Sequence, residues 1–226
     1  AQGLYEGVEV EGTLKGLITY MRTDSLRLSP EAKEMAKNFI FEKYGEKYWG
    51  NEVEKKDKNA KKIQDAHEAI RPTDVYLIPN EIKKFLNEDQ YKLYKLIWER
   101  FLISQFAKME YEQFEILSEY DNYEFRGAAN KITFDGYYKI FKDEDEIKTI
   151  DFPAINVGDK FDLMKLNIVE GETKPPAKLT ESTLVKKLEA DGIGRPSTYA
   201  SIIDTLKKKE YVILDGKKFT PTELGY

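Results

Sequence analysis

Apolar residues recur at helical spacing in two long stretches of the first half of the chain. The first stretch is "LSPEAKEMAKNFIFEKYG", residues 28–45. Ser29 is a favourable N-cap, Pro30 suits the first helical position, and Gly45 is a natural helix end. One apolar face contains five residues spaced by three or four positions: Ala32, Met35, Ala36, Phe39 and Ile40. The second stretch, 87–109, predicts a longer helix with an apolar face of Leu93, Ile97 and Phe101, so we expect residues up to about Phe106 to be mostly helical.

The hydrophobic period changes in the middle of the chain. Residues 110–117, 122–134, 137–141 and 160–169 alternate or cluster strand-forming residues, which is typical of β-structure. Breaks are expected at Gly127, at 135–136 and at 157–159. The pattern predicts a small antiparallel sheet or barrel. Residues 171–178 then read as an extended linker, because Pro175 and Pro176 restrict the backbone.

The last stretch predicts a helix, a turn, a second helix and a hairpin. Thr180 is an N-cap for the first helix, and Ser197 or Thr198 lies near the start of the second. Asp215 and Gly216 suit a two-residue hairpin turn. This order resembles a winged helix-turn-helix, a shape that often binds DNA. We therefore expect a multi-domain α+β fold with a helical domain (1–106), a β-rich arch or hinge domain (107–177) and a winged-helix-like segment (178–226).

Composition narrows the classes of function. The 226 residues suit one large domain or two to three small ones, and 41% apolar with 34% charged residues is typical of a soluble protein with real cores. We expect no membrane span and no signal peptide, since no long apolar run or charged-then-apolar leader occurs. The absence of cysteine excludes disulfides and fits a reducing, cytoplasmic compartment, and a single histidine, His67, excludes a multi-histidine metal site.

The charge distribution is uneven. The net charge is −5, but residues 178–226 carry nine Lys/Arg and seven Asp/Glu, which is +2, and the remainder is −7. A basic C-terminal segment on an acidic body is compatible with DNA binding without being a strong signal. The charged run at 55–64 is interpreted as a mobile solvated loop. Asp143 and Asp145 have a spacing that can hold Mg²⁺, but we interpret them as another solvated loop.

Three polar clusters suit phosphate chemistry. In "GLITYMRTDS" (16–25), an extended strand would place Tyr20, Arg22 and Asp24 on one face, so that a tyrosine nucleophile lies beside a guanidinium that stabilises a phosphoryl charge. In "DAHEAIRPT" (65–73), His67 and Arg71 would share one helix face and donate hydrogen bonds to one phosphate. Taken singly, the first cluster is better explained as a strand end, and the second as a structural histidine with an arginine at a helix end.

The third cluster is "GIGRPSTYAS", residues 192–201. Gly192 and Gly194 permit close backbone approach, and the helix start with the Ser197 and Thr198 hydroxyls makes an anion seat beside Arg195. The plain alternative is a glycine helix end followed by a capped helix, and by itself the cluster is a weak signal.

Together, and in this order, the three clusters resemble the type IA DNA topoisomerases, most of all the bacterial members. The resemblance covers nearly the whole chain and includes the long helix at 93–109. It implies that Tyr20 is the nucleophile that becomes linked to a 5′ phosphate of single-stranded DNA, that Arg22 stabilises that phosphate, and that His67 contacts a phosphate nearby. It implies a set of DNA-binding residues as well: Asp24, Glu68, Arg71, Arg195, Ser197, Thr198, Gln2 and Glu6.

The resemblance also implies that the metal-binding part of the site lies outside this chain. In the family, an acidic Toprim domain N-terminal to the tyrosine binds Mg²⁺, so we expect this chain to be a fragment with the tyrosine half of the site and no metal of its own. We expect it to bind DNA weakly and to be inactive without the Toprim half. The full reaction would be ATP-independent relaxation of negatively supercoiled DNA by strand cleavage, strand passage and religation, in the nucleoid.

Three alternatives stay open on the sequence. The chain is a non-catalytic winged-helix module that binds nucleic acid, a purely structural domain, or part of another type IA enzyme such as topoisomerase III or reverse gyrase. The first two leave the joint occurrence of three phosphate-suited clusters unexplained. The cleavage preference, the oligomeric state and the general base do not follow from these residues.

Overall fold

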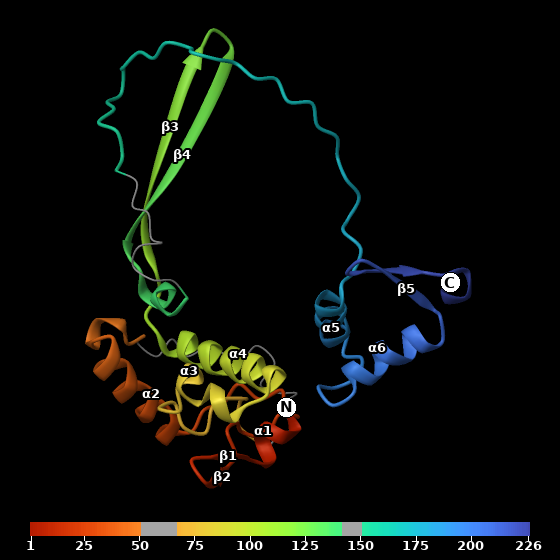
Figure 1. Cartoon of the computed structure of the whole chain (residues 1–226). Coiled ribbons are helices and arrows are strands. Elements are labelled where there is room, and N and C mark those ends of the chain that lie inside the picture. Colours follow the sequence, from red (N-terminus) through yellow and green to blue (C-terminus); the bar gives the residue numbers. More distant parts are fainter. Residues whose placement is uncertain (51–66, 142–150) are drawn as a thin grey trace. The chain divides into compact units, whose positions relative to one another are not determined.

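The computed structural model describes residues 1–50, 67–141 and 151–226 (Figure 1). The charged run at 55–64 and the Asp143–Asp145 pair lie outside these residues. The chain forms two compact units: residues 1–21 with 25–159, and residues 22–24 with 160–226. Helices combine with small antiparallel hairpins, so the expected mixture of α and β structure is confirmed, while the predicted domain boundaries stay predictions.

The helical part of the first unit follows the sequence pattern closely. Its elements are α1 (Gln2–Glu6), β1 (Val8–Val10), β2 (Thr13–Lys15), α2 (Pro30–Lys43), a 3₁₀ turn η1 (Glu46–Tyr48), α3 (Pro79–Ile82), η2 (Lys83–Phe85) and α4 (Glu88–Gln105). The β1–β2 hairpin was not predicted. Its turn places Glu11 at φ 54° and Gly12 at φ 76°, and the left-handed conformation at Gly12 suits glycine.

Helix α2 begins and ends at the predicted signals. The Ser29 hydroxyl accepts a hydrogen bond from the Ala32 N–H at 3.2 Å, and Pro30 is the first helical residue. Gly45 follows the helix end at φ 97°, and its N–H donates to the Ile40 carbonyl at 3.0 Å. Such a left-handed residue closes the last turn without a steric penalty when it is glycine.

Helix α4 buries Phe101 as predicted, but two of its other buried residues lie one position after the predicted Leu93 and Ile97. Tyr94, Trp98, Phe101 and Leu102 are buried, whereas Leu93 and Ile97 are half-buried. Large aromatic residues with one polar atom can be buried when that atom finds a partner. The Tyr94 hydroxyl donates to the Leu77 carbonyl at 2.7 Å, and the Trp98 Nε1–H donates to the Val75 carbonyl at 2.8 Å.

The core of this unit joins α2, α4 and the N-terminal segment. Phe39 of α2 meets Trp98 of α4 edge-on, with ring centroids 5.7 Å apart. Leu17 and Ile18 enter the same core at 0% and 1% exposure. Residues 17–18 are therefore fixed by hydrophobic burial, and this fixes the start of the segment that carries Tyr20.

The middle of the chain contains one long hairpin. Strands β3 (Glu110–Tyr120) and β4 (Tyr123–Phe134) pair antiparallel, which confirms the first two predicted strands. Gly127 does not break β4, since it lies opposite Ile116 in the ladder. The described residues form a two-stranded ribbon there and no barrel.

Two predicted strands are wrong. Residues 136–140 form a 3₁₀ turn (η3, Gly136–Ile140), because Gly136 at φ 48° turns the chain against the backbone of Lys108. Residues 160–169 have no regular structure and are exposed. A strand needs a ladder partner to satisfy its backbone groups, and the described residues offer none to this segment.

The second unit contains helix, turn, helix and hairpin in the predicted order. Its elements are α5 (Glu181–Ala190), α6 (Tyr199–Lys208), β5 (Val212–Asp215), β6 (Lys218–Pro221) and η5 (Glu223–Gly225). Thr180 caps α5 as predicted, in a reciprocal capping box with Thr183. The hairpin turn is shifted by one residue to 216–217, because Asp215 pairs with Lys218 in the ladder. Residues 171–178 are exposed and irregular, as expected of a linker.

Candidate active site

Tyr20 follows a short extended segment that pairs with a distant part of the chain. The Thr19 N–H donates to the Arg71 carbonyl and the Thr73 N–H donates to the Leu17 carbonyl, each at 3.0 Å. Ile18 and Pro72 form an antiparallel bridge between these bonds. We call residues 17–19 and 69–73 the clamp. It places the backbone just before Tyr20 beside the backbone just after His67.

Two local predictions are corrected here. Residues 67–71 are irregular and not helical, so His67 and Arg71 do not share a helix face. Backbone groups of Ala69, Arg71 and Thr73 bond to the rest of the clamp or to neighbouring loops instead of to a helical ladder. No strand runs through Tyr20 either, because Thr19, Met21 and Arg22 lie in bends. The alternation that placed Tyr20, Arg22 and Asp24 on one face therefore does not apply.

The Tyr20 ring contacts two other rings. Its centroid is 4.6 Å from that of His67, with the planes tilted by 32°, and 5.4 Å from that of Tyr5, in an edge-to-face arrangement. Tyr20 is half-buried, whereas His67 and Tyr5 are exposed. Such ring pairs are favourable by about 0.5–1.5 kcal/mol. The phenol is thus in contact with two other rings at a partly solvent-accessible position.

Glu68 and Arg71 form an ion pair within the segment that follows His67. The Arg71 Nε–H donates to Glu68 Oε2 at 2.9 Å, and the side chains are 12% and 29% exposed respectively. The Ser29 N–H lies 3.4 Å from the same oxygen, at the start of α2. The hydrogen bond from Arg71 is the main reason that the pKa of the Glu68 carboxyl is lowered. Arg71 also donates through Nη1 to the Pro72 carbonyl at 3.0 Å, so its guanidinium braces the loop.

Gln2 and Glu6 lie at the two ends of α1. The Gln2 amide donates to the Glu6 carboxylate one helical turn away, and both side chains are exposed. The Leu17 N–H donates to the Leu4 carbonyl at 2.7 Å, which docks α1 onto the clamp. Gly16 lets the two backbones come this close, because a Cβ at that position would lie 2.8 Å from the Tyr5 carbonyl oxygen.

The remaining predicted site residues belong to the second compact unit. Arg22 and Asp24 are exposed, as are Arg195, Ser197 and Thr198. The Thr198 hydroxyl accepts a hydrogen bond from the Arg195 N–H at 2.9 Å, and the Tyr199 N–H donates to the Arg195 carbonyl at 3.1 Å. These groups of the expected anion seat are therefore already paired within the turn. Arg195 itself donates through Nη1 to the Gly194 carbonyl at 2.7 Å.

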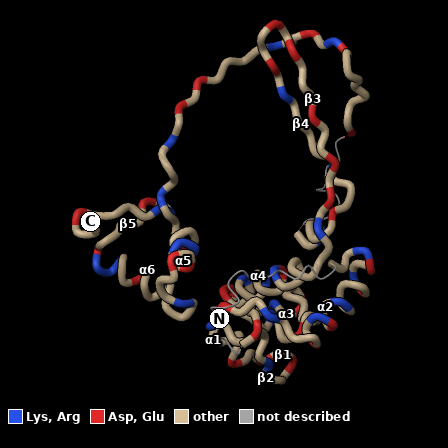
Figure 2. The backbone as a smooth tube through the Cα atoms, turned by 180° about the vertical axis from the view of Figure 1, so that it is seen from behind, with Lys and Arg blue, Asp and Glu red and all other residues tan. Residues whose placement is uncertain are grey.

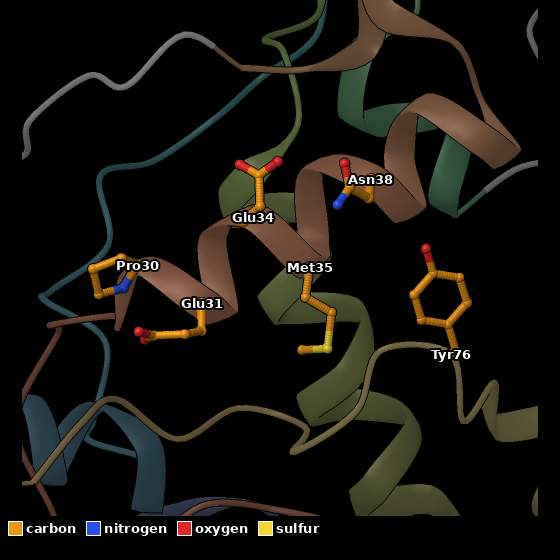
Figure 3. A pocket seen from close by; sticks show the side chains of 6 residues that line it. All are labelled: Pro30, Glu31, Glu34, Met35, Asn38 and Tyr76. Atoms are coloured by element: carbon orange, nitrogen blue, oxygen red, sulfur yellow. The ribbon is translucent and has the colours of Figure 1, made fainter.

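The described residues offer no metal centre at Tyr20. Within residues 1–50, 67–141 and 151–226, no three His, Asp or Glu side chains come together as metal ligands would. Lysine and glutamate are interspersed along α2 (Figure 2). A surface pocket lies on that helix, and none of the predicted site residues lines it (Figure 3); its lining residues are Pro30, Glu31, Glu34, Met35, Asn38 and Tyr76. None of the helices in the described part has the length and apolar character to cross a membrane.

The sequence analysis missed Thr19, Thr73 and Ser29 as supports of the site. The Thr73 hydroxyl donates to the Gly16 carbonyl at 2.6 Å, and Thr19 bonds to the segment that follows His67. A faint signal was present: Thr19 is a polar residue placed directly between buried Ile18 and Tyr20. Its partners are 50 and more residues away, and no local pattern identifies them.

Comparisons with known proteins agree with one another. A family model described as DNA topoisomerase matches residues 1–226. The chain is 50% identical over 227 aligned residues to DNA topoisomerase 1 of Thermotoga maritima, covering all of this chain and 35% of that protein. It superposes on the crystal structure of full-length topoisomerase I from Thermotoga maritima with a TM-score of 0.77 and 41% identity, covering 99% of this chain and 36% of that one. The chain therefore spans about a third of the length of these relatives.

Proposed function

The chain belongs to the type IA DNA topoisomerases, and from this premise we propose that it supplies the tyrosine half of a DNA-cleaving active site. The observation that supports this most directly is the contact between the Tyr20 and His67 rings. These two residues lie in the first and second phosphate-suited clusters, 47 positions apart. The clamp brings them together at an accessible surface, as a site for a polymer substrate requires.

The proposed reaction is a transesterification. The Tyr20 hydroxyl loses its proton and attacks the phosphorus of a phosphodiester in single-stranded DNA. A bond forms between Tyr20 Oη and phosphorus, and the bond from phosphorus to the 3′ oxygen breaks. The 3′ oxygen leaves with a proton, and the tyrosine holds the 5′ phosphate. One phosphate ester replaces another, so the reverse step reseals the strand without ATP.

The neighbouring cations would stabilise the charge that develops on the phosphoryl oxygens. We assign this role to Arg22, with His67 on an adjacent phosphate, because cationic and N–H donors placed at such charge are worth several kcal/mol in a transition state. The exposed residues Asp24, Arg195, Ser197 and Thr198 would hold the DNA backbone, with Gln2 and Glu6 beside it on α1. Glu68 and Arg71 are paired to each other, so we assign them to bracing His67 as well as to DNA contact.

Magnesium does not fit the described residues. They contain no cluster of carboxylates, so we propose that Mg²⁺ is bound by a Toprim domain outside this chain. That domain would complete the site. We derive no step through the metal.

The other parts of the chain fit a strand-passage enzyme. We propose that α5, α6 and the β5–β6 hairpin form a winged-helix-like DNA-binding segment, and that the long β3–β4 ribbon is part of the arch that moves when the gate opens. The complete enzyme would relax negatively supercoiled DNA in the cytoplasm, at the nucleoid. The chain alone would bind single-stranded DNA weakly and relax nothing, and relaxation of plasmid by the pure chain would overturn that expectation.

The test is covalent capture of DNA. The chain is mixed with a separately made Toprim domain of the family, Mg²⁺ and a 3′-labelled single-stranded oligonucleotide, and then denatured. Labelled protein is expected, since the tyrosine keeps the 3′ piece. Tyr20→Phe should abolish the label and keep DNA binding. Tyr120→Phe is the matched control, because Tyr120 is 77% exposed at the end of β3, and it should behave as wild type.

A non-catalytic nucleic-acid-binding module is the second candidate. The helix, turn, helix and hairpin order of the second unit favours it. In that case DNA would bind, and no protein would carry label in either the wild type or Tyr20→Phe. Decatenation compared with relaxation by the complete enzyme would separate topoisomerase III from topoisomerase I.

A further inference from the structure

We propose that Thr19 is a positioning residue, which holds the His67 segment in register against the nucleophile through its hydroxyl group. The inference rests on the proposed function, and it adds a residue that neither the motif nor the comparisons assign. Thr19 precedes Tyr20 directly in the chain. Its side chain bonds to the one segment that carries His67.

The Thr19 hydroxyl both donates and accepts a hydrogen bond. Its proton goes to the Ala69 carbonyl at 2.8 Å, and its oxygen accepts from the Arg71 N–H at 3.0 Å. The Arg71 carbonyl lies 3.5 Å away, too far to compete for the single proton. The backbone N–H of Thr19 donates to that carbonyl at 3.0 Å. One residue therefore makes three hydrogen bonds to residues 69–71.

This segment needs external support. It is irregular, so it has no helical ladder of its own. Among the described residues, the other backbone hydrogen bond of residues 67–71 comes from the Ala69 N–H, which donates to the Arg27 carbonyl at 2.8 Å. Because Ala69 is only two residues after His67, a shift of Ala69 changes the 4.6 Å separation of the Tyr20 and His67 rings.

The hydroxyl, not the shape of the side chain, carries this role. Valine has nearly the same shape, but Thr19→Val leaves the Ala69 carbonyl and the Arg71 N–H without this partner in a half-buried place. Serine keeps the hydroxyl. A displacement of a reacting group by about 1 Å can cost about a hundredfold in rate. We expect Thr19→Val to slow DNA cleavage by about tenfold or more.

The experiment measures the rate of covalent capture with the chain, the Toprim domain and the labelled oligonucleotide described above. Thr19→Val should slow capture while the Kd for DNA changes less than about twofold, and Thr19→Ser should restore the rate to within about threefold. Ser104→Ala is the control. It removes a hydroxyl from the same compact unit, one that donates to the Phe101 carbonyl within α4 and not to the His67 segment, and it should leave the capture rate within about twofold.

A double-mutant comparison separates positioning from a general loss of structure. If Thr19 acts through His67, adding Thr19→Val to His67→Ala should cost less than about twofold more, because the group that it positions is already gone. If the two losses multiply independently, the proposal is overturned. Equal slowing of capture by Thr19→Val and Ser104→Ala would also overturn it. Absence of capture by the wild type, or capture by Tyr20→Phe, would instead overturn the proposed function.

Discussion

Replacing Glu68 by glutamine tests the Glu68–Arg71 ion pair beside the candidate active site. The substitution keeps the shape and an oxygen acceptor but removes the charge. A hydrogen bond between charged groups is worth about 1.5–3 kcal/mol. Glu68 is 29% and Arg71 12% exposed, so solvent screening places the pair near the lower limit. The nearby Ser29 N–H at the start of α2 adds about 0.5 kcal/mol. We expect Glu68→Gln to lower the free energy of unfolding by about 1.5 kcal/mol at pH 7.

The pH dependence of this difference follows from the lowered pKa of Glu68. The unfolded carboxyl titrates near pH 4.3, and the folded one at a lower pH. Its stabilisation is therefore complete above the unfolded pKa and is lost as the pH falls through the folded pKa. The difference between the wild type and Glu68→Gln should be constant from pH 6 to 8 and should shrink below about pH 4.

Urea unfolding followed by tryptophan fluorescence measures the stability of the first compact unit, which contains Glu68. The chain has two tryptophans, and both Trp49 and Trp98 lie in the first compact unit. Glu34→Gln is a matched control, because Glu34 is exposed on α2, and it should change stability by less than about 0.5 kcal/mol. If Glu68→Gln matched this control at pH 7, or if its effect persisted at pH 3, the brace would not be electrostatic.

Three further substitutions test the supports of the site. Tyr94→Phe should cost about 1–3 kcal/mol in urea unfolding, since it leaves the half-buried Leu77 carbonyl without its donor. Burial raises the pKa of Tyr94, so wild-type stability should fall as the pH rises above about 10, where the unfolded tyrosine ionises, and the stability of the variant should fall less steeply. Gly50→Ala should cost about 1–3 kcal/mol and speed proteolysis at the start of β3, because its Cβ would lie 2.5 Å from the Phe106 carbonyl oxygen; unchanged stability would mean that this junction yields easily. Ser29→Ala should lower the thermal midpoint by removing the cap of α2, at about 1 kcal/mol, and an unchanged midpoint would show that the cap is dispensable.

The sequence predicted what is encoded locally. Helix α2 lies between its cap at Ser29 and its stop at Gly45, and β3 and β4 follow their alternating residues. Residues 160–169 have an equally good alternating pattern and form no strand, because a pattern does not supply a partner. In the same way, the motifs predicted that Tyr20 and His67 act together, but the strand predicted at Tyr20 and the helix predicted at His67 are wrong. The extended segment before Tyr20 and the loop after His67 are shaped by bonds to each other, across 50 residues of chain.

That separation has a kinetic consequence for the clamp. Closing a loop of about 50 residues costs about 3.5 kcal/mol of chain entropy. The hydrogen bonds of Thr19, at about 1 kcal/mol each, barely offset it. The packing of Phe39 against Trp98, with Leu17 and Ile18 buried nearby, has to come first. We therefore expect the Tyr20–His67 contact to form late in folding, so a molecule that has not finished folding would lack the proposed cleavage site.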